Sequence, residues 1–240
     1  DWRVLSLLLL GFSAGLPILL IFSSLSLWLG EAGVERKAVT FFSWAALGYS
    51  FKFIWAPLVD RLPLPLLTAW LGRRRAYMLL AQVGAAGAIV GMAFTDPAAG
   101  GHPLTTMALF AVLLGFMSAT QDIVIDAYRI EIGRPEQQGL LSSAYIAGYR
   151  LGMIVAGAGA LFLASHWGSV KGAYHYEAWQ WTYLVMAATL VGCQSTRQLD
   201  ESDSVRAHNY QARIKHKPSP LLVKPAEQAP QDVWERMRQG

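Results

Sequence analysis

The sequence predicts an all-α membrane protein, a six-helix transmembrane bundle. Of its 240 residues, 54% are hydrophobic and 15% are charged, which is less charge than a soluble domain of this length usually carries. The apolar residues gather in runs of roughly 20, and a helix of that length crosses the ~30 Å hydrocarbon core of a bilayer. Helices satisfy their backbone hydrogen bonds within the segment, and these runs lack the alternation of barrel strands.

The six predicted spans make up a first domain, residues 1–195. Five runs have the length of a full crossing, whereas the sixth, at roughly 14 residues, is short. Residues 196–240 form a polar, basic tail, which we expect to be disordered and cytoplasmic. A solvated linker is the favoured interpretation of this tail, and binding of anionic lipid head groups is the alternative. Because the chain starts at Asp1 rather than Met, we expect a trimmed start. The predicted spans are 4–29, 38–59, 76–94, 104–127, 140–164 and 179–192.

The distribution of Lys and Arg predicts a cytoplasmic amino terminus. Positive residues collect in the cytoplasmic loops of membrane proteins. With the amino terminus inside, seven of these residues lie on the cytoplasmic side and three on the opposite side. The inner set is Arg3, Arg61, Arg73, Arg74, Arg75, Arg129 and Arg134, and the outer set is Arg36, Lys37 and Lys171.

Small residues spaced four apart predict close packing between helices. The fifth span carries such a stripe along its whole length, and the first and third spans carry shorter ones. A face without bulky side chains lets two backbones approach, as in small-xxx-small membrane packing. We therefore expect a tight bundle. The long stripe is Ala144, Gly148, Gly152, Ala156, Ala160 and Ala164, and the short ones are Gly11 with Gly15 and Gly87 with Gly91.

Four charged residues, Lys52, Asp122, Asp126 and Arg150, fall inside the predicted spans, where a charge costs roughly 2.5–3.5 kcal/mol on insertion scales. Lys52, Asp122 and Arg150 belong to three different spans, and all lie roughly 10 to 15 Å from the cytoplasmic side. Asp126 follows on the same helix face as Asp122. Arg129, three residues further on, is placed to pair with Asp126.

Two interpretations of this layer of charges stay open. In a structural one, Asp122 pairs with Arg150 or Lys52 and locks the bundle, although buried pairs stabilise less than apolar packing does. In a functional one, the layer lines a water-filled pathway for substrate or protons. Its net positive charge would suit an anionic substrate. The uncharged hydrogen-bonding neighbours of these charges are Tyr49, Thr120, Gln121 and Tyr149.

The loop between the second and third predicted spans resembles the cytoplasmic G-x-x-x-D-R-x-G-R-R motif of the major facilitator superfamily. An Asp at the end of one helix can hold an Arg cluster at the start of the next, and such a clasp can break as a bundle rocks. A positively charged cytoplasmic anchor is the alternative. Ala56 stands in place of the leading Gly, and residues 62–71 are an insertion. The motif residues are Asp60, Arg61, Gly72, Arg73, Arg74 and Arg75.

Five sequence blocks in order make the resemblance more specific. Together they resemble the AmpG-type muropeptide permeases, and the related acetyl-coenzyme A transporters share part of the pattern. The resemblance covers about residues 5–167. The blocks are LGFSAGLP (10–17), FKFIWAP (51–57), GRRR (72–75), SATQDIVIDA (118–127) and GYRLGM (148–153).

The resemblance implies the amino-terminal half of a major facilitator-type transporter in the bacterial inner membrane. Permeases of this kind import anhydro-muropeptides from periplasm to cytoplasm as proton symporters, for peptidoglycan recycling and, in some bacteria, β-lactamase induction. By family position, Gly11, Gly15, Ala119, Gln121 and Asp122 are expected to line or shape the pathway. Asp122 or Asp126 is the candidate proton carrier. With the charges described above, the predicted pathway residues are Gly11, Gly15, Lys52, Ala119, Gln121, Asp122, Asp126, Tyr149 and Arg150.

The family has at least twelve helices in two halves, with the substrate site between them. A truncated gene, a second half on another chain and a homodimer of halves are the open explanations for a single half. Two other functions stay open: a carrier of acetyl-coenzyme A or another anionic solute, and a non-transporting fragment or partner of a full-length permease. We expect no enzyme activity, cofactor, metal or nucleic-acid partner, because the sequence offers no metal-binding His pair, nucleophile elbow or phosphate loop.

Overall fold

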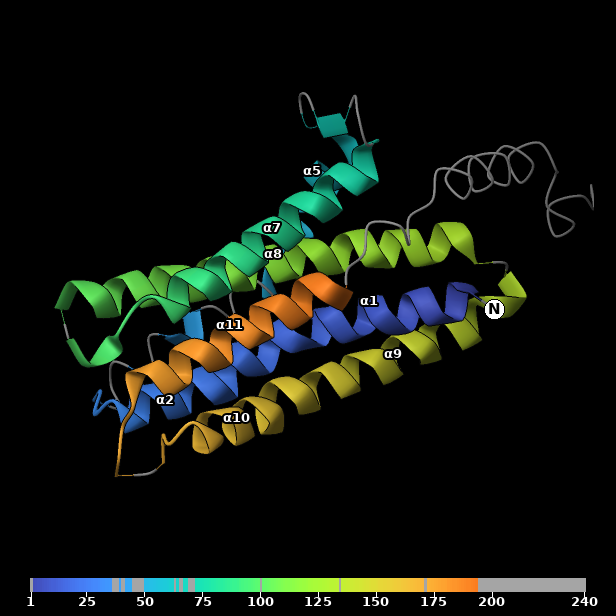
Figure 1. Ribbon diagram of the computed structural model, residues 1–240. Coiled ribbons are helices and arrows are strands. Elements are labelled where there is room, and N and C mark those ends of the chain that lie inside the picture. The colour runs from blue at the N-terminus through green and yellow to red at the C-terminus, as the bar shows by residue number, and fades with distance from the viewer. Residues whose placement is uncertain are drawn as a thin grey trace, which may run out of the picture. The chain divides into compact units, whose positions relative to one another are not determined.

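The structure is a computed structural model of the chain (Figure 1). It describes residues 2–35, 39, 42–44, 50–62, 64, 67–68, 72–99, 101–133, 135–170 and 172–193. All of them lie in the first of the two units into which the chain divides, residues 1–200. Several predictions therefore lie outside the described residues: Asp1, Arg36, Lys37, Tyr49, Arg134, Lys171 and the tail.

The described residues form helices, and their one β interaction is an isolated bridge between Val170 and Ala173. An all-α architecture is thereby confirmed for the described part of the chain. Two long helices each contain a π-helical turn: η1 lies between α1 and α2, and η5 lies between α9 and α10. In chain order the elements are α1 (Trp2–Leu19), η1 (Leu20–Ser24), α2 (Leu25–Glu31), η2 (Phe42–Trp44), α5 (Lys52–Arg61), α7 (Arg73–Ala93), η3 (Pro97–Ala99), α8 (Gly101–Ile132), η4 (Pro135–Gln137), α9 (Gln138–Ile154), η5 (Val155–Gly159), α10 (Ala160–His166) and α11 (Tyr176–Cys193).

Four helical stretches of the described chain are long and apolar enough to cross a membrane. They correspond to the first, third, fourth and fifth predicted spans, and each begins before its predicted span. Hydropathy marks the part of a helix inside lipid, whereas charged turns such as those at Arg73 and Glu131 continue the helix beyond it. The four stretches are Arg3–Glu31, Arg73–Ala93, Gly101–Ile132 and Pro135–His166.

The second and sixth predicted spans differ from these four. Of 38–59, the structure describes mainly α5 and a few residues before it, so this crossing stays a prediction. The sixth span is α11, and its 18 residues exceed the roughly 14 expected from the apolar run. The prediction was too short because the polar Glu177, which precedes the apolar run, already belongs to the helix, which also continues to Cys193.

The closest helix pair is α1 with α9, which lie side by side in Figure 1. Glycines from both helices meet the other helix's backbone. A Cβ atom at Gly11 would collide with the carbonyl oxygen of Tyr145, and one at Gly148 with that of Leu8. Gly15 and Gly152 make the equivalent approaches one turn further along. Only glycine allows two backbones to come this near, which is the small-xxx-small mode.

The long stripe of small residues in the fifth span is confirmed as a packing face, because all six of its members are buried. The short stripe of the third span is only half right. Gly91 packs against the ring of Phe110 on α8, but Gly87 is exposed and has no neighbour within contact distance. Gly84, which contacts Met117, takes its place at the contact between α7 and α8.

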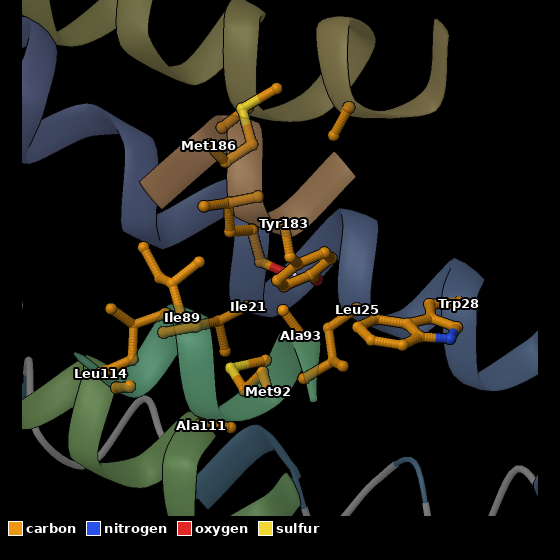
Figure 2. Packing of buried hydrophobic residues seen from close by; sticks show 14 of the residues in the cluster. Ile21, Leu25, Trp28, Ile89, Met92, Ala93, Ala111, Leu114, Tyr183 and Met186 are labelled. Carbon is orange, nitrogen blue, oxygen red and sulfur yellow. Dashed lines mark hydrogen bonds between the residues drawn. The ribbon is translucent and has the colours of Figure 1, made fainter. Parts of the chain in front are cut away.

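In the main apolar core, side chains of α7, α8 and α11 pack against those of the first long helix, which consists of α1, η1 and α2. Figure 2 shows Ile21 and Leu25 facing Ile89 and Met92 of α7, with Tyr183 of α11 beside them. These side chains are all almost fully buried. The Tyr183 hydroxyl donates to the carbonyl of Leu20 at 3.1 Å, so this buried polar group is satisfied.

The two π-helical turns are neighbours, because η1 and η5 pack against each other. A π turn inserts one residue into a helix and displaces backbone groups from their usual partners. Ser24 in η1 donates its hydroxyl hydrogen bond to the carbonyl of Ala156 in η5, at 2.7 Å and fully buried. This bond joins the two irregular turns at the middle of their helices.

Removing the Ser24 hydroxyl is expected to destabilise the protein. Ser24→Ala leaves the buried Ala156 carbonyl short of a partner, which costs about 1–3 kcal/mol. Ser26→Ala is the matched control, because the Ser26 hydroxyl bonds only to Phe22 in its own helix. Thermal unfolding of the purified protein in detergent measures both. Equal midpoints for the two variants would contradict a special role for the bond across the π turns.

Candidate functional site

The centre of the candidate site is an ion pair between two of the predicted charges. Lys52 Nζ on α5 lies 4.0 Å from Asp122 Oδ2 on α8. The Asp122 side chain is only 10% exposed, whereas that of Lys52 is 40% exposed. Of the two partners that the sequence left open for Asp122, the structure selects Lys52. The pair thus has one deeply buried member and one member that remains accessible from outside the bundle.

Tyrosine and glutamine side chains surround the Asp122 carboxylate. Tyr145 of α9 donates its hydroxyl to Asp122 Oδ1 at 3.4 Å, and its ring lies 6.1 Å from that of Tyr149. Beside Asp122, Gln121 is fully buried and donates from Nε2 to Ser13 Oγ of α1 at 3.0 Å. Polar groups from α1, α5, α8 and α9 therefore converge on one place.

One polar atom of this cluster has no partner among the described residues. Gln121 Oε1 is buried and accepts no hydrogen bond. Leaving a buried acceptor unpaired costs about 1–3 kcal/mol, so such groups in proteins commonly mark a bound molecule or a functional role. Ala119, the small residue predicted for the pathway on this helix, is fully buried three positions before Asp122.

Arg150 does not join the ion pair, so the predicted alternative in which it pairs with Asp122 is not seen among the described residues. Its side chain is exposed on α9, and no carboxylate of the described residues pairs with it. The reason is the rotation of α9. Gly148 and Gly152 face α1, and Arg150 lies about 200° around the helix from each of them. The glycine contact therefore turns Arg150 away from α1.

Asp126 and Arg129 form the expected pair, with Arg129 Nη2 lying 3.3 Å from Asp126 Oδ1. Arg129 also donates to the Ser142 hydroxyl of α9, so it links α8 to α9. The Asp126 side chain is 48% exposed. It is therefore much less buried than Asp122, and it already has a cationic partner.

One arginine of the loop motif has an acidic partner that the motif does not include. Arg74 at the start of α7 pairs with Glu131 at the end of α8, so an acidic residue outside the motif holds the Arg cluster. Arg61 and Arg73 are exposed, and Gly72 ends the loop with a φ of 79°. The side chain of Asp60 lies outside the described residues. A role for Asp60 in the clasp therefore stays a prediction.

Four contributors to these contacts were missed by the sequence interpretation: Ser13, Tyr145, Ser142 and Glu131. Ser13 and Tyr145 lie within mostly apolar spans and carry no charge, so nothing in the sequence marked them as site residues. Glu131 lies one helical turn beyond a predicted span, and an acidic residue there was a usable signal for a partner of the Arg cluster. The remaining predicted residues, Gly11 and Gly15, lie against the α9 backbone, close to Ser13 in the sequence.

No group of three or more metal-ligating side chains occurs in the part of the chain that the structure describes. The candidate site instead consists of one ion pair, hydroxyl groups and one amide. Such groups can bind a polar solute or exchange a proton without a bound metal.

Comparison with known proteins places these features in a transporter family. The chain is 40% identical over 187 residues to the anhydromuropeptide permease of Escherichia coli, which covers 78% of this chain and 35% of the permease. It is 37% identical over 191 residues to the putative transporter AmpG 4 of Rickettsia conorii, which covers 80% of this chain and 43% of that protein. The chain thus spans less than half the length of these relatives.

The apolar helices and these relatives identify a multi-pass membrane protein. A family model also matches the chain, over residues 3–176, and its description is Acetyl-coenzyme A transporter 1. The matched residues include α1, α5, α7, α8 and α9, and so all of the candidate site. Because the match covers more than half of the sequence, the chain belongs to the family described as Acetyl-coenzyme A transporter 1.

Proposed function

We propose that this chain forms the amino-terminal bundle of a proton-coupled secondary transporter that imports anhydro-muropeptides for peptidoglycan recycling. The observation that carries the proposal is the pair of Lys52, at the start of α5, and Asp122, inside the apolar helix α8, flanked by the unpaired Gln121 oxygen. Charges in such a place are costly, and in membrane proteins they mark pathways by default. The E. coli relative supports the substrate, since it is named an anhydromuropeptide permease.

The exposed positions of Lys52 and Arg150 fit an anionic, hydroxyl-rich substrate. An exposed arginine in the middle of a membrane helix is expensive against lipid, so we assign its face of α9 to a water-filled cavity or to a second bundle. Muropeptides carry peptide carboxylates for these cations and sugar hydroxyls for Gln121 Oε1. Asp122 would carry the proton, because its pairing with Lys52 couples its charge to an accessible cation.

The proposed location is the bacterial inner membrane, with the amino terminus in the cytoplasm. Arg3 at the start of α1, the Arg73–Arg75 cluster at the start of α7 and Arg129 near the end of α8 support this orientation by the positive-inside rule. A second bundle, on another chain or from a second copy, would supply the opposite wall of the cavity.

Uptake of labelled anhydro-muropeptide by a permease-null strain that expresses this chain tests the proposal. We expect accumulation above the empty-vector strain, and a collapse of that accumulation when a protonophore is added. Membrane insertion is checked in parallel by fractionation. Absence of uptake with correct insertion would refute transport by the isolated chain, and the same assay with a co-expressed carboxy-terminal half would then test the role of a second bundle.

A second candidate is a carrier of acetyl-coenzyme A or another anionic solute, because the matching family model is described as Acetyl-coenzyme A transporter 1. The same two cations would bind its phosphates. Accumulation of labelled acetyl-coenzyme A in vesicles, with no response to muropeptide, would favour this candidate.

A further inference from the structure

A pocket of about 360 Å³ lies far from the candidate site, at the other end of the bundle. It is formed where α2 and α10 end and α11 begins. Its walls combine one carboxylate, two serine hydroxyls and several apolar or aromatic side chains. Pockets of this volume hold small ligands or lipid headgroups. The lining residues are Glu31, Leu161, Phe162, Ala164, Ser165, Ser169, Val170 and Trp179.

Glu31 is the charged group of this pocket. Its Oε2 atom accepts hydrogen bonds from Ser169 Oγ at 2.6 Å and from Trp179 Nε1 at 2.8 Å. These two donors are uncharged, and no cation of the described residues forms an ion pair with Glu31. Among the described residues the carboxylate is thus held in place by uncharged donors alone, and this arrangement favours a cationic ligand.

The support behind Glu31 is rigid. Trp179 stacks on Trp28 with ring centroids 5.7 Å apart and planes at 4°, and both rings are buried. Trp28 donates to the Tyr174 hydroxyl, which in turn donates to Asp96 at 2.7 Å. Burial and this bond to Asp96 raise the pKa of Tyr174 above its usual range, so the hydroxyl remains a donor. The pocket wall is therefore preorganised before any ligand binds.

The depth of the pocket matches the headgroup region of a bilayer. The Tyr176 hydroxyl at the start of α11 bonds to the carbonyl of Ala93, the last residue of α7, so Glu31 lies at the α7 end remote from Arg73. The 21 residues of α7 span roughly 30 Å, the thickness of a hydrocarbon core. Phe162, which is 69% exposed, extends the pocket wall along the outer surface of α10.

We propose that this pocket is a binding site for a primary ammonium group, as in the headgroup of an amino-phospholipid of the leaflet opposite the Arg cluster. The ammonium would donate to the Glu31 carboxylate and to the exposed Ser165 hydroxyl, while the buried Ser169 and Trp179 hold that carboxylate from behind. The exposed apolar wall at Leu161 and Phe162 would contact the acyl chains. A trimethylammonium group carries the same charge but has no N–H donor, so it would bind less tightly.

The test is competitive lipid retention by the full chain, and it needs no transport activity. The protein is purified in detergent with equal amounts of phosphatidylethanolamine and phosphatidylcholine, and bound lipid is counted by native mass spectrometry. We expect a preference of about tenfold for phosphatidylethanolamine, the effect of one hydrogen bond between charged groups. Glu31→Gln should abolish this preference, because the amide still accepts from Ser169 and Trp179 but has lost its charge.

Glu177→Gln is the matched control, since Glu177 is exposed at the same end of the bundle and does not line the pocket. A second arm tests a soluble source by adding ethanolamine to lipid-free protein and measuring the thermal midpoint. Stabilisation of the wild type but not of Glu31→Gln, without any lipid preference, would support the ammonium site with a soluble ligand. Equal behaviour of wild type and Glu31→Gln in both arms would overturn the proposal.

Discussion

Gly148→Ala is expected to destabilise the bundle by at least about 2 kcal/mol, although it adds a single methyl group. The new Cβ would collide with the carbonyl oxygen of Leu8, which belongs to the backbone of α1 and cannot rotate aside. The two helices would have to separate along the tightest contact of the structure. Thermal or denaturant unfolding of purified protein, together with the yield of monodisperse material, measures the effect.

Gly139→Ala is the matched control on the same helix. Nothing lies within contact distance of a Cβ at this exposed position, so alanine should stabilise α9 by about 0.5–1 kcal/mol through its better helix propensity. The two identical chemical changes should thus have opposite signs. Similar effects at Gly139 and Gly148 would show that propensity, and not the backbone contact, decides stability here.

Gly11→Ala should have nearly the same effect as Gly148→Ala, since it brings a Cβ against the Tyr145 carbonyl from the other side of the same contact. Once one substitution has moved the helices apart, the second has less overlap to relieve. The double variant should therefore lose less stability than the sum of the single ones.

The packing of α1 on α9 was partly predictable, because a stripe of small residues four apart is a local pattern and its burial follows from helix geometry alone. The partner of that stripe was not predictable, since it depends on which helix comes near. Once Gly148 is known to face α1, however, the orientation of Arg150 follows from the helical repeat. Applying the helical repeat to the stripe would have placed Arg150 on the opposite face of α9, and would have excluded it as a direct partner of Asp122.

The Lys52–Asp122 pair shows where sequence reasoning ends. The sequence placed Lys52, Asp122 and Arg150 at similar depths in three helices. Depth alone does not tell which way a helix face is turned or how far apart the helices lie. The tertiary contacts of Ser13 and Tyr145 have the same character, because their partners lie 108 and 23 residues away in the sequence. The Glu31 pocket also joins distant segments, with Glu31 bonded to residues 138 and 148 positions further along.

Asp122→Asn is expected to reduce proton-driven uptake by about tenfold or more, to near the background of the assay. The substitution keeps the shape of the side chain and an acceptor for Tyr145, but it removes the charge that pairs with Lys52. Stability should change little, because Lys52 is 40% exposed and water can solvate it once the partner is neutral. Asp126→Asn is the control, since Asp126 is half exposed and bound to Arg129, and we expect it to retain uptake.

Neutralising both members of the pair separates a proton carrier from a structural lock. If Asp122 served only to balance Lys52, the double variant Lys52→Met with Asp122→Asn would recover the uptake that Asp122→Asn loses, because no unpaired charge would remain. If Asp122 carries the proton, the double variant stays inactive, and we expect this result. Infrared difference spectra of the purified chain give a readout that does not need transport. The chain has 16 Asp and Glu residues that absorb as carboxylic acids on acidification, and one component of that absorption, present in the wild type and in Asp126→Asn, should be missing in Asp122→Asn. Recovery of uptake in the double variant, or an unchanged absorption in Asp122→Asn, would assign the ion pair to the structure of the bundle alone.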